Sequence, residues 1–278
     1  MPGRRPPSNR AAVPEEFAMP RFAANLSLMF NEVEFMARFE RAAHAGFAGV
    51  EFLFPYAWAA DDIAGALEAH RLTQVLFNAP PGDWDGGERG LAALPGREAE
   101  FRAGLDDVLR YAERLDCRRV HVMAGNVADL AAAEAMHATY LDNLAHAADR
   151  FAAYGITALI EPINSRDMPH YFLTRQAAAH EIVAEVGADN IAVQMDFYHA
   201  QIMDGDIWTT FRAGRDNIGH IQIAGVPERN EPDDGELNYP WLFERLDAAG
   251  YNGWVGCEYI PRDDTESGLG WFAPWRRR

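Results

Sequence analysis

The chain has 278 residues, of which 49% are hydrophobic and 24% charged, a composition typical of a globular protein with one large core or two small ones. Its 42 acidic and 25 basic residues give a formal net charge of -17, and each of the 25 is an arginine. Nucleic-acid binding depends on clustered cationic side chains, so the acidic balance argues against it. Because lysine is absent, a Schiff-base aldolase, a pyridoxal-phosphate enzyme and a P-loop nucleotidase are excluded.

Cys117 and Cys257 are the only two cysteines, too few for a disulfide scaffold or a thiolate metal site. We expect both to be small buried apolar residues, and the protein to work in a reducing compartment, the cytoplasm. No apolar run reaches the roughly 18 residues of a membrane span, so no membrane partner is expected.

The first 20 residues are rich in proline, arginine and alanine and lack apolar periodicity. They are predicted to form a flexible tail without a signal-peptide core, and Met19 is an alternative natural start. The folded domain is predicted to span residues 21–278, as one barrel with a C-terminal extension.

From Arg21 onward, short apolar runs alternate with amphipathic stretches eight times, the pattern of parallel β/α units. The predicted strands are Phe22–Ser27, Gly49–Phe54, Gln74–Asn78, Arg119–Ala124, Ala158–Pro162, Ile191–Asp196, Ile218–Ala224 and Gly253–Glu258. The predicted helices include Glu32–Ala45, Ile63–Ala69, Arg97–Leu115, Leu130–Tyr154, Arg175–Val186 and Trp241–Ala249. Eight units in about 250 residues favour a single closed (β/α)8 TIM barrel. An open doubly wound sheet is the alternative, but the G-x-G-x-x-G fingerprint is missing.

Functional groups of such a barrel lie at the C-terminal ends of its strands. The last four predicted strands end in the polar residues Glu161, Asp196, Gln222 and Glu258. Three converging carboxylates repel one another and raise their pKa values, a cost that a bound cation removes. An all-oxygen set favours Mg²⁺ or Mn²⁺ over Zn²⁺. The four residues are therefore predicted to hold a divalent metal, although any one carboxylate alone could instead cap a helix or pair with a loop arginine.

Three further residues are candidates for substrate binding. His199 follows Asp196 by three residues and could donate a hydrogen bond to a substrate oxygen, or could be a loop histidine bonded to backbone. Arg229 lies in the loop after the seventh strand, where its guanidinium could pair with a substrate carboxylate or simply be solvated. Asn78 ends the third predicted strand, ahead of a turn-rich segment that contains Trp84.

At these residues the chain resembles the hydroxypyruvate isomerase family of the xylose-isomerase-like barrels, over essentially Met19 to Trp271. The segments that carry the resemblance are Phe22–Ser27, Gly49–Tyr56, Phe77–Gly90, Leu159–Asn164, Gln194–His199, His220–Gly225 and Gly256–Tyr259. The resemblance implies that Glu161, Asp196, Gln222 and Glu258 hold the metal and that Glu161 and Glu258 transfer the proton.

The implied reaction interconverts hydroxypyruvate and tartronate semialdehyde, a small oxo acid and hydroxy aldehyde, through an ene-diolate without net redox change. Isomerisation of 2-oxotetronate and 3-epimerisation of a keto sugar remain alternatives, although the 3-epimerases carry histidine where this chain has Gln222. Two classes outside this chemistry are a sugar-acid binding barrel without catalysis and a metal-dependent endonuclease, which would need a basic face.

The loop after the seventh strand departs from the family, because Glu228 and Asn230 stand where relatives often have glycine and histidine. We expect an extra negative charge near Arg229, which leaves the preferred acid open. A homo-oligomer is possible.

Overall fold

The computed structural model describes residues 20–127 and 130–276. Eight parallel strands close into a barrel in chain order, with β8 beside β1. The strands are β1 (Arg21–Asn25), β2 (Gly49–Glu51), β3 (Thr73–Asn78), β4 (Arg119–His121), β5 (Thr157–Ile160), β6 (Ile191–Asp196), β7 (Ile218–Ile223) and β8 (Trp254–Cys257). The predicted (β/α)8 barrel is confirmed.

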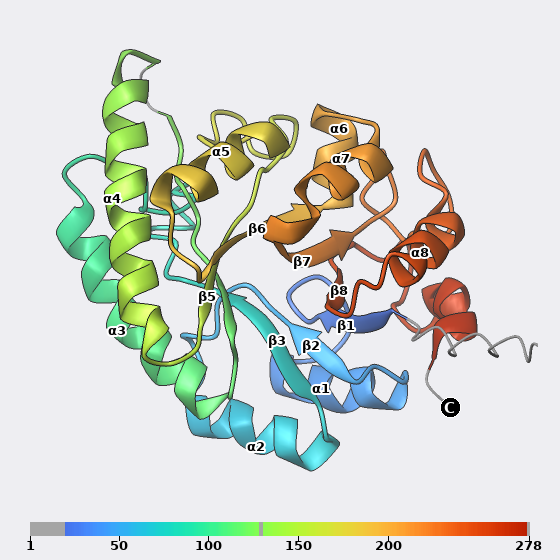
Figure 1. Cartoon of the computed structure of the whole chain (residues 1–278). Helices are drawn as coiled ribbons and strands as arrows, with labels where there is room; N and C mark the ends of the chain where they lie inside the picture. The colour runs from blue at the N-terminus through green and yellow to red at the C-terminus, as the bar shows by residue number, and fades with distance from the viewer. Residues whose placement is uncertain (1–19, 128–129, 277–278) are drawn as a thin grey trace, which may run out of the picture.

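Helices surround this barrel on the outside (Figure 1). The α-helices are α1 (Phe35–His44), α2 (Ala60–His70), α3 (Glu98–Arg114), α4 (Ala133–Ala152), α5 (Gln176–Val186), α6 (Phe197–Met203), α7 (Ile207–Gly214) and α8 (Tyr239–Ala248). The short 3-10 segments are η1 (Leu130–Ala132), η2 (Arg215–Asn217) and η3 (Ser267–Trp275). Six of the α-helices match predicted ones to within a few residues, whereas α6, α7 and η3 were not predicted.

The two missed α-helices are short and follow one another directly after β6. Four successive residues of α6, Phe197 to Ala200, are buried, and the last three, Gln201 to Met203, are partly exposed. An amphipathic period is the main helix signal in a sequence, and a helix of seven residues with this burial pattern does not produce it.

Glycines at positive φ follow several of these helices. Gly187 follows α5 with φ 66 and serves as its left-handed C-cap, and Gly46 after α1 has φ 96. Glycine has no Cβ, so its backbone adopts this left-handed conformation at little cost. The turn back toward the next strand is therefore encoded locally.

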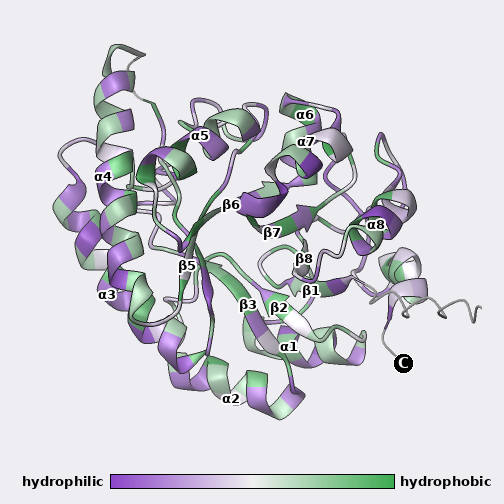
Figure 2. Cartoon of the chain, viewed as in Figure 1, coloured by the Kyte–Doolittle hydropathy of each residue, from purple (hydrophilic) through white to green (hydrophobic). Residues whose placement is uncertain are grey.

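The hydrophobic core has two parts. A large cluster fills the space between the strands and the helices, and Figure 2 shows apolar residues along the strands and mixed residues on the helices. A small second cluster is made of Ala23, Val75, Leu76, Leu159 and Trp254. In β1, β5 and β8 these residues precede the polar strand ends, so polar side chains occupy the C-terminal end of the barrel and apolar ones lie below them.

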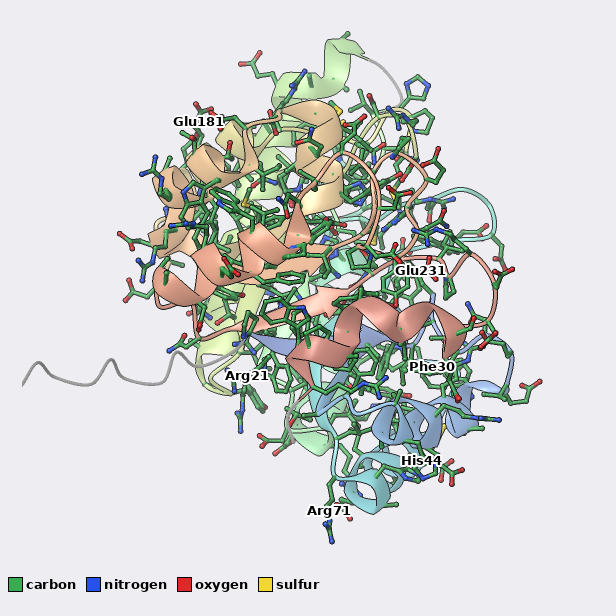
Figure 3. The ribbon with its side chains drawn as sticks, turned by 90° about the vertical axis from the view of Figure 1, so that its right-hand side faces the viewer. Arg21, Phe30, His44, Arg71, Glu181 and Glu231 are labelled. Carbon is green, nitrogen blue, oxygen red and sulfur yellow. The ribbon has the colours of Figure 1, made fainter. Side chains whose placement is uncertain are left out.

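The outer surface is highly charged. Arg71 and Glu181 are exposed, and Figure 3 shows their side chains pointing away from the barrel. Cys117 and Cys257 are both buried, as predicted, and burial raises the pKa of each thiol. None of the described helices is long and apolar enough to cross a membrane. The predicted tail falls on residues 1–19, outside the described residues, apart from Pro20, which is buried.

Candidate active site

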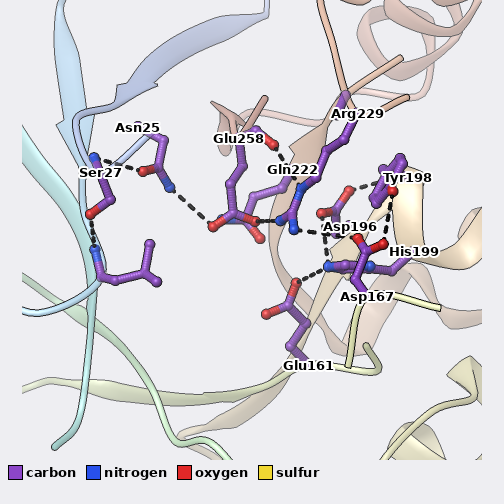
Figure 4. A network of polar contacts seen from close by, with 12 residues as sticks. Asn25, Ser27, Glu161, Asp167, Asp196, Tyr198, His199, Gln222, Arg229 and Glu258 are labelled. Carbon is purple, nitrogen blue, oxygen red and sulfur yellow. Dashed lines mark hydrogen bonds and ion pairs between the residues drawn. The ribbon is translucent and has the colours of Figure 1, made fainter. Parts of the chain in front are cut away.

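Carboxylates from three strands meet at the C-terminal end of the barrel (Figure 4). Glu161 and Glu258 directly follow β5 and β8, and Asp196 ends β6. One side-chain atom from each of these residues and from His199 lies within 4.8 Å of the others, and all four residues are buried. Because the strands are parallel, their carboxyl ends bring residues far apart in sequence to one place.

Asp196 has two distinct carboxylate oxygens. Its Oδ1 accepts a hydrogen bond of 2.8 Å from the backbone N–H of Tyr198 and caps α6. Its Oδ2 has no hydrogen-bond partner among the described residues. A capping role and a ligand role are therefore compatible, since a different oxygen serves each.

The orientation of the Asn164 side chain is fixed by its own turn. Its Oδ1 accepts the backbone N–H groups of Arg166 and Asp167, at 2.9 and 2.8 Å. The amide nitrogen is therefore directed at Nδ1 of His199, 2.6 Å away, and the backbone N–H of Asn164 donates to the same atom at 3.4 Å.

His199 is consequently a hydrogen-bond donor toward the cluster. Burial, then the charges of Arg229 and His121, hold its pKa well below the ordinary value, so the ring is neutral at pH 7. Since Nδ1 accepts from Asn164, the single proton resides on Nε2. That atom lies 3.6 Å from Asp196 Oδ2 and 3.9 Å from Glu161 Oε1. A protonated nitrogen cannot coordinate a metal, so this tautomer favours contact with a substrate oxygen.

Glu258 has a donor on each oxygen. Asn25 Nδ2 donates to Oε1 at 3.1 Å, and Arg229 Nη2 donates to Oε2 at 2.9 Å. Arg229 also lies 3.5 Å from Asp167 Oδ2 and above the ring of Tyr198, 5.2 Å from its centroid. Although burial opposes its charge, the carboxylates around it, first Glu258, keep the pKa of Arg229 above its usual range. The predicted loop arginine is thus held at the mouth of the site.

The carboxyl pKa values of the cluster are all raised. Burial, then the charges of Glu258 and Asp196, raises the pKa of Glu161 well above 4.5. Burial raises the pKa of Asp196 to about 6 and that of Glu258 to about 8, each opposed by Arg229. Glu161 Oε1 and Asp196 Oδ2 have no hydrogen-bond partner among the described residues. Buried, mutually repelling carboxylates with unpartnered oxygens fit a divalent cation.

Gln222 lies in β7, in register with Asp196 of β6, and is buried. Its Nε2 donates to Glu51 Oε1 at 2.8 Å, and its Oε1 accepts from Gln194 Nε2 at 2.6 Å. The carbonyl oxygen has a second lone pair. Gln222 as a metal ligand stays a prediction.

Among the described residues, neither Asn78 nor Glu228 contacts the acidic cluster. Asn78 ends β3 and is buried, with its amide nitrogen 3.8 Å from Met123 Sδ; its role in substrate binding stays a prediction. Glu228 is exposed, and the carboxylates that contact Arg229 are those of Glu258 and Asp167.

Several polar residues of the site were not singled out from the sequence. Asn25, Glu51 and His121 end β1, β2 and β4, and all three are buried. His121 Nδ1 lies 3.4 Å from Glu161 Oε2, and burial lowers its pKa to about 3. In the sequence each of the three is followed by further apolar residues of the predicted strand, so the rule that identified the acids, a polar residue at the end of an apolar run, does not single them out. Asp167 carries no such signal either, because it lies in a loop.

The geometry agrees with the comparisons with known proteins. The family model described as xylose isomerase-like TIM barrel matches residues 39–275. The chain belongs to this family. The resemblance drawn from the strand-end motifs is therefore confirmed, and it extends to named relatives along almost the whole chain.

Two relatives with assigned activities match at high identity. The 2-oxo-tetronate isomerase of Cupriavidus necator is 58% identical over 260 residues, which cover 94% of this chain and 100% of the relative. The hydroxypyruvate isomerase of Escherichia coli is 45% identical over 258 residues, covering 93% and 100%. The chain therefore spans the full length of both relatives.

Two solved structures show the same barrel. A structure from Brucella melitensis described as AP endonuclease, family 2, has a TM-score of 0.92 and 57% sequence identity, covering 93% of this chain and 100% of that one. A D-psicose 3-epimerase has a TM-score of 0.75 at 16% identity, covering 92% and 99%. At 16% identity the likeness shows the fold alone.

Proposed function

We propose that this family member is a divalent-metal-dependent isomerase of small oxo acids that interconverts hydroxypyruvate and 2-hydroxy-3-oxopropanoate (tartronate semialdehyde). One observation carries the proposal: Glu161 and Glu258 are buried beside each other with raised pKa values. A carboxyl group whose pKa is raised is a stronger base when ionised, so it can accept a carbon-bound proton and return it. The reaction needs just such a transfer between two adjacent carbons, and the name of the Escherichia coli relative supports it.

The residues that would hold the metal are Glu161, Asp196, Gln222 and Glu258, a set of oxygen donors suited to Mg²⁺ or Mn²⁺. When bound, the cation supplies Lewis-acid stabilisation of the negative charge that develops on two neighbouring substrate oxygens. The buried carboxylates attract it because a positive charge relieves their mutual repulsion.

The chain's own residues would move the proton and hold the substrate. One of Glu161 and Glu258 removes the carbon-bound proton, and the other delivers a proton to the neighbouring carbon. His199 donates its Nε2–H to a substrate oxygen, and Arg229 pairs with the substrate carboxylate through two parallel hydrogen bonds. Because these groups are fixed by Asn164 and Asp167, they are in place before substrate binds, and little reorganisation is needed during the reaction.

A second candidate substrate is 2-oxotetronate, which has the same oxo acid end and one more hydroxymethyl group. It is favoured by the name of the Cupriavidus necator relative at 58% identity and by a second 2-oxo-tetronate isomerase at 48%. The same two glutamates would transfer a proton between the second and third carbons. The 3-epimerase alternative rests on fold likeness alone.

The decisive experiment supplies hydroxypyruvate, 2-oxotetronate and a ketohexose to the purified protein with Mn²⁺ or Mg²⁺ and follows each by proton NMR. We expect conversion of hydroxypyruvate, loss of activity after chelation, and recovery with Mn²⁺ or Mg²⁺. Conversion of 2-oxotetronate alone would establish the second candidate. Turnover of only the ketohexose, or full activity in metal-free protein, would contradict the proposal.

The setting of this reaction is also proposed. The two buried thiols, Cys117 and Cys257, fit a reducing compartment such as the cytoplasm. The partner is a small oxo or hydroxy acid rather than nucleic acid, in keeping with the net charge of -17. Self-association stays a prediction, which size-exclusion chromatography with light scattering would check.

A further inference from the structure

A fourth carboxylate, Glu51 at the end of β2, is linked to the acidic cluster through Asn25 and is fully buried. Its Oε1 accepts Nδ2 of Asn25 at 3.2 Å and Nε2 of Gln222 at 2.8 Å. Its Oε2 lies 2.8 Å from Nε2 of His220. An ionised carboxylate has only acceptor atoms, so each neighbour must turn a donor toward it.

Asn25 connects this carboxylate to Glu258. Its Oδ1 accepts the backbone N–H of Ser27 at 3.0 Å, while its Nδ2 reaches both Glu51 Oε1 at 3.2 Å and Glu258 Oε1 at 3.1 Å. In the opposite amide orientation, Oδ1 would face two carboxylate oxygens and the nitrogen would face an N–H group. Glu51 and Ser27 therefore fix the orientation in which Asn25 donates to Glu258. Figure 4 shows the contacts of Asn25 with Ser27 and with Glu258.

Gln222 is fixed in the same way. Its nitrogen is engaged by Glu51 and its carbonyl oxygen by the amide of Gln194. Only the carbonyl oxygen can bind a cation, and it has one lone pair beyond the one that Gln194 uses. Gln194 does not fix this orientation by itself, because its own Oε1 has no hydrogen-bond partner among the described residues, so its amide could reverse and present an acceptor instead.

Strand β8, which β1 separates from β2 in the barrel, leaves room for this carboxylate. A Cβ atom at Gly256, in β8, would lie 2.4 Å from both carboxylate oxygens of Glu51. Real Cβ atoms do not approach oxygen so closely, and Gly256 has no positive φ that would by itself require glycine. The glycine is thus explained by the space that the Glu51 carboxylate occupies.

We propose that Glu51 is a positioning residue of the active site, whose Oε1 sets the amide orientations of Asn25 and Gln222. Through Asn25 it places Glu258, and through Gln222 it directs a carbonyl oxygen rather than an N–H group toward the cation. The inference rests on the proposed function, in which Glu258 and Gln222 hold the metal.

The test compares Mn²⁺ dissociation constants, measured by titration calorimetry without substrate, for the wild type, Glu51→Ala and Glu51→Gln. Water in the space left by alanine can donate or accept, so it does not impose an orientation, and we expect Mn²⁺ binding to weaken by the roughly 10- to 100-fold typical of a lost supporting partner. Glutamine should restore near wild-type binding. Its oxygen can replace Oε1, and its nitrogen can face His220, which accepts there after a change of tautomer.

Gly256→Ala is the second variant, because it displaces the carboxylate without removing it, and it should weaken Mn²⁺ binding as Glu51→Ala does. If thermal melts show that Glu51→Ala does not fold, Gly256→Ala alone tests the positioning role of Glu51. The matched control is His220→Gln. That residue is equally buried but contacts only Oε2, and the new amide still donates, so Mn²⁺ binding should stay near the wild-type value.

Wild-type Mn²⁺ affinity in Glu51→Ala and Gly256→Ala would overturn the inference. Glu51→Gln binding as weakly as Glu51→Ala would also overturn it, because charge rather than acceptor geometry would then matter. If Mn²⁺ affinity follows the expected order across the variants but the wild type isomerises none of the oxo acids, the proposed reaction is wrong and the positioning role of Glu51 stands. A wild type that does not bind Mn²⁺ would overturn both.

Discussion

Glu161 and Glu258 differ in how their neighbours hold them. Both oxygens of Glu258 receive donors, from Asn25 and from Arg229. Glu161 has His121 beside Oε2, while its Oε1 has no hydrogen-bond partner within the described chain. Donors stabilise the ionised form of a carboxyl group, so the two acids enter the reaction with different proton affinities, as an acid and base pair requires.

Glu161→Gln and Glu258→Gln should each lower kcat by at least the roughly 10² to 10⁴ expected for a lost general acid or base. The amide preserves shape and one oxygen but does not accept a proton at neutral pH. The assay is run at saturating Mn²⁺ with occupancy checked, and deuterium exchange from solvent is followed beside product formation. A variant that exchanges the substrate proton without making product identifies the residue that delivers it. Near-normal turnover in both would move the search to His199.

The raised carboxyl pKa values predict an unusual pH dependence of stability in metal-free protein. Between the unfolded value near 4.5 and the folded value of about 8 for Glu258, the folded chain holds more protons than the unfolded one. The free energy of unfolding therefore falls as pH rises through this window. Because a bound cation requires deprotonated ligands, Mn²⁺ affinity should rise over the same range, with proton release.

Thermal melts of metal-free protein from pH 5 to pH 8 check this pH dependence, with Glu258→Gln as the matched variant that lacks the titrating group. We expect the melting temperature of the wild type to fall more steeply with pH than that of the variant. Equal slopes would show that Glu258 does not retain its proton in the folded state.

At the scale of elements, β6 and α6 form one unit through Asp196. The strand ends at this residue and the helix begins at the next one, so its carboxylate both caps a helix and faces the cluster. From the sequence alone, a loop position was open for His199, whereas it lies in the first turn of α6, with its Nε2 directed at the carboxylates. Because the strand is joined directly to the helix, the His199 side chain has less conformational freedom than it would have in a loop.

Two substitutions at Asp196 should separate its two roles. Asparagine caps helices about as well as aspartate, whereas alanine loses the cap at about 1 kcal/mol. We expect metal-free Asp196→Asn to melt at or above the wild-type temperature, since one repelling charge is gone, and Asp196→Ala to melt lower than Asp196→Asn. Both should bind Mn²⁺ more weakly by calorimetry. Equal melting temperatures for the two variants would show that the cap contributes nothing.

At the scale of the whole molecule, closure of the barrel assembles the site. Asn25 and Glu258 are 233 residues apart in sequence, and Glu51 and Gln222 are 171 apart. Only pairing of β8 with β1 brings the first pair together. Loss of closure would therefore break the hydrogen bonds that hold these carboxylates before it exposed much of the large core between the strands and the helices.

The folded unit is predicted to begin near Arg21, so a chain that lacks Met1 to Ala18 should keep its melting temperature and turnover nearly unchanged. The removed residues offer no apolar periodicity to bury and no strand end to the site. Thermal melts and the hydroxypyruvate assay on both lengths check this. A large loss of either property would show that the segment packs on the barrel.

The sequence by itself determined the barrel and its acids. Apolar runs, amphipathic stretches and glycine caps are local patterns, and each needs only neighbouring residues to form, so eight strands could be placed to within a few residues. Glu161, Asp196 and Glu258 were found because parallel strands send their carboxyl ends to one face, whatever the details of packing.

Only the tertiary structure decided how those groups are held. The amide orientations of Asn25 and Gln222 and the tautomer of His199 depend on partners that lie elsewhere in the chain, and the fold buries the first four residues of α6. A sequence pattern records what each residue prefers next to its neighbours. Which oxygen of a carboxylate receives a donor is settled only when the barrel closes and distant donors arrive at a fixed distance.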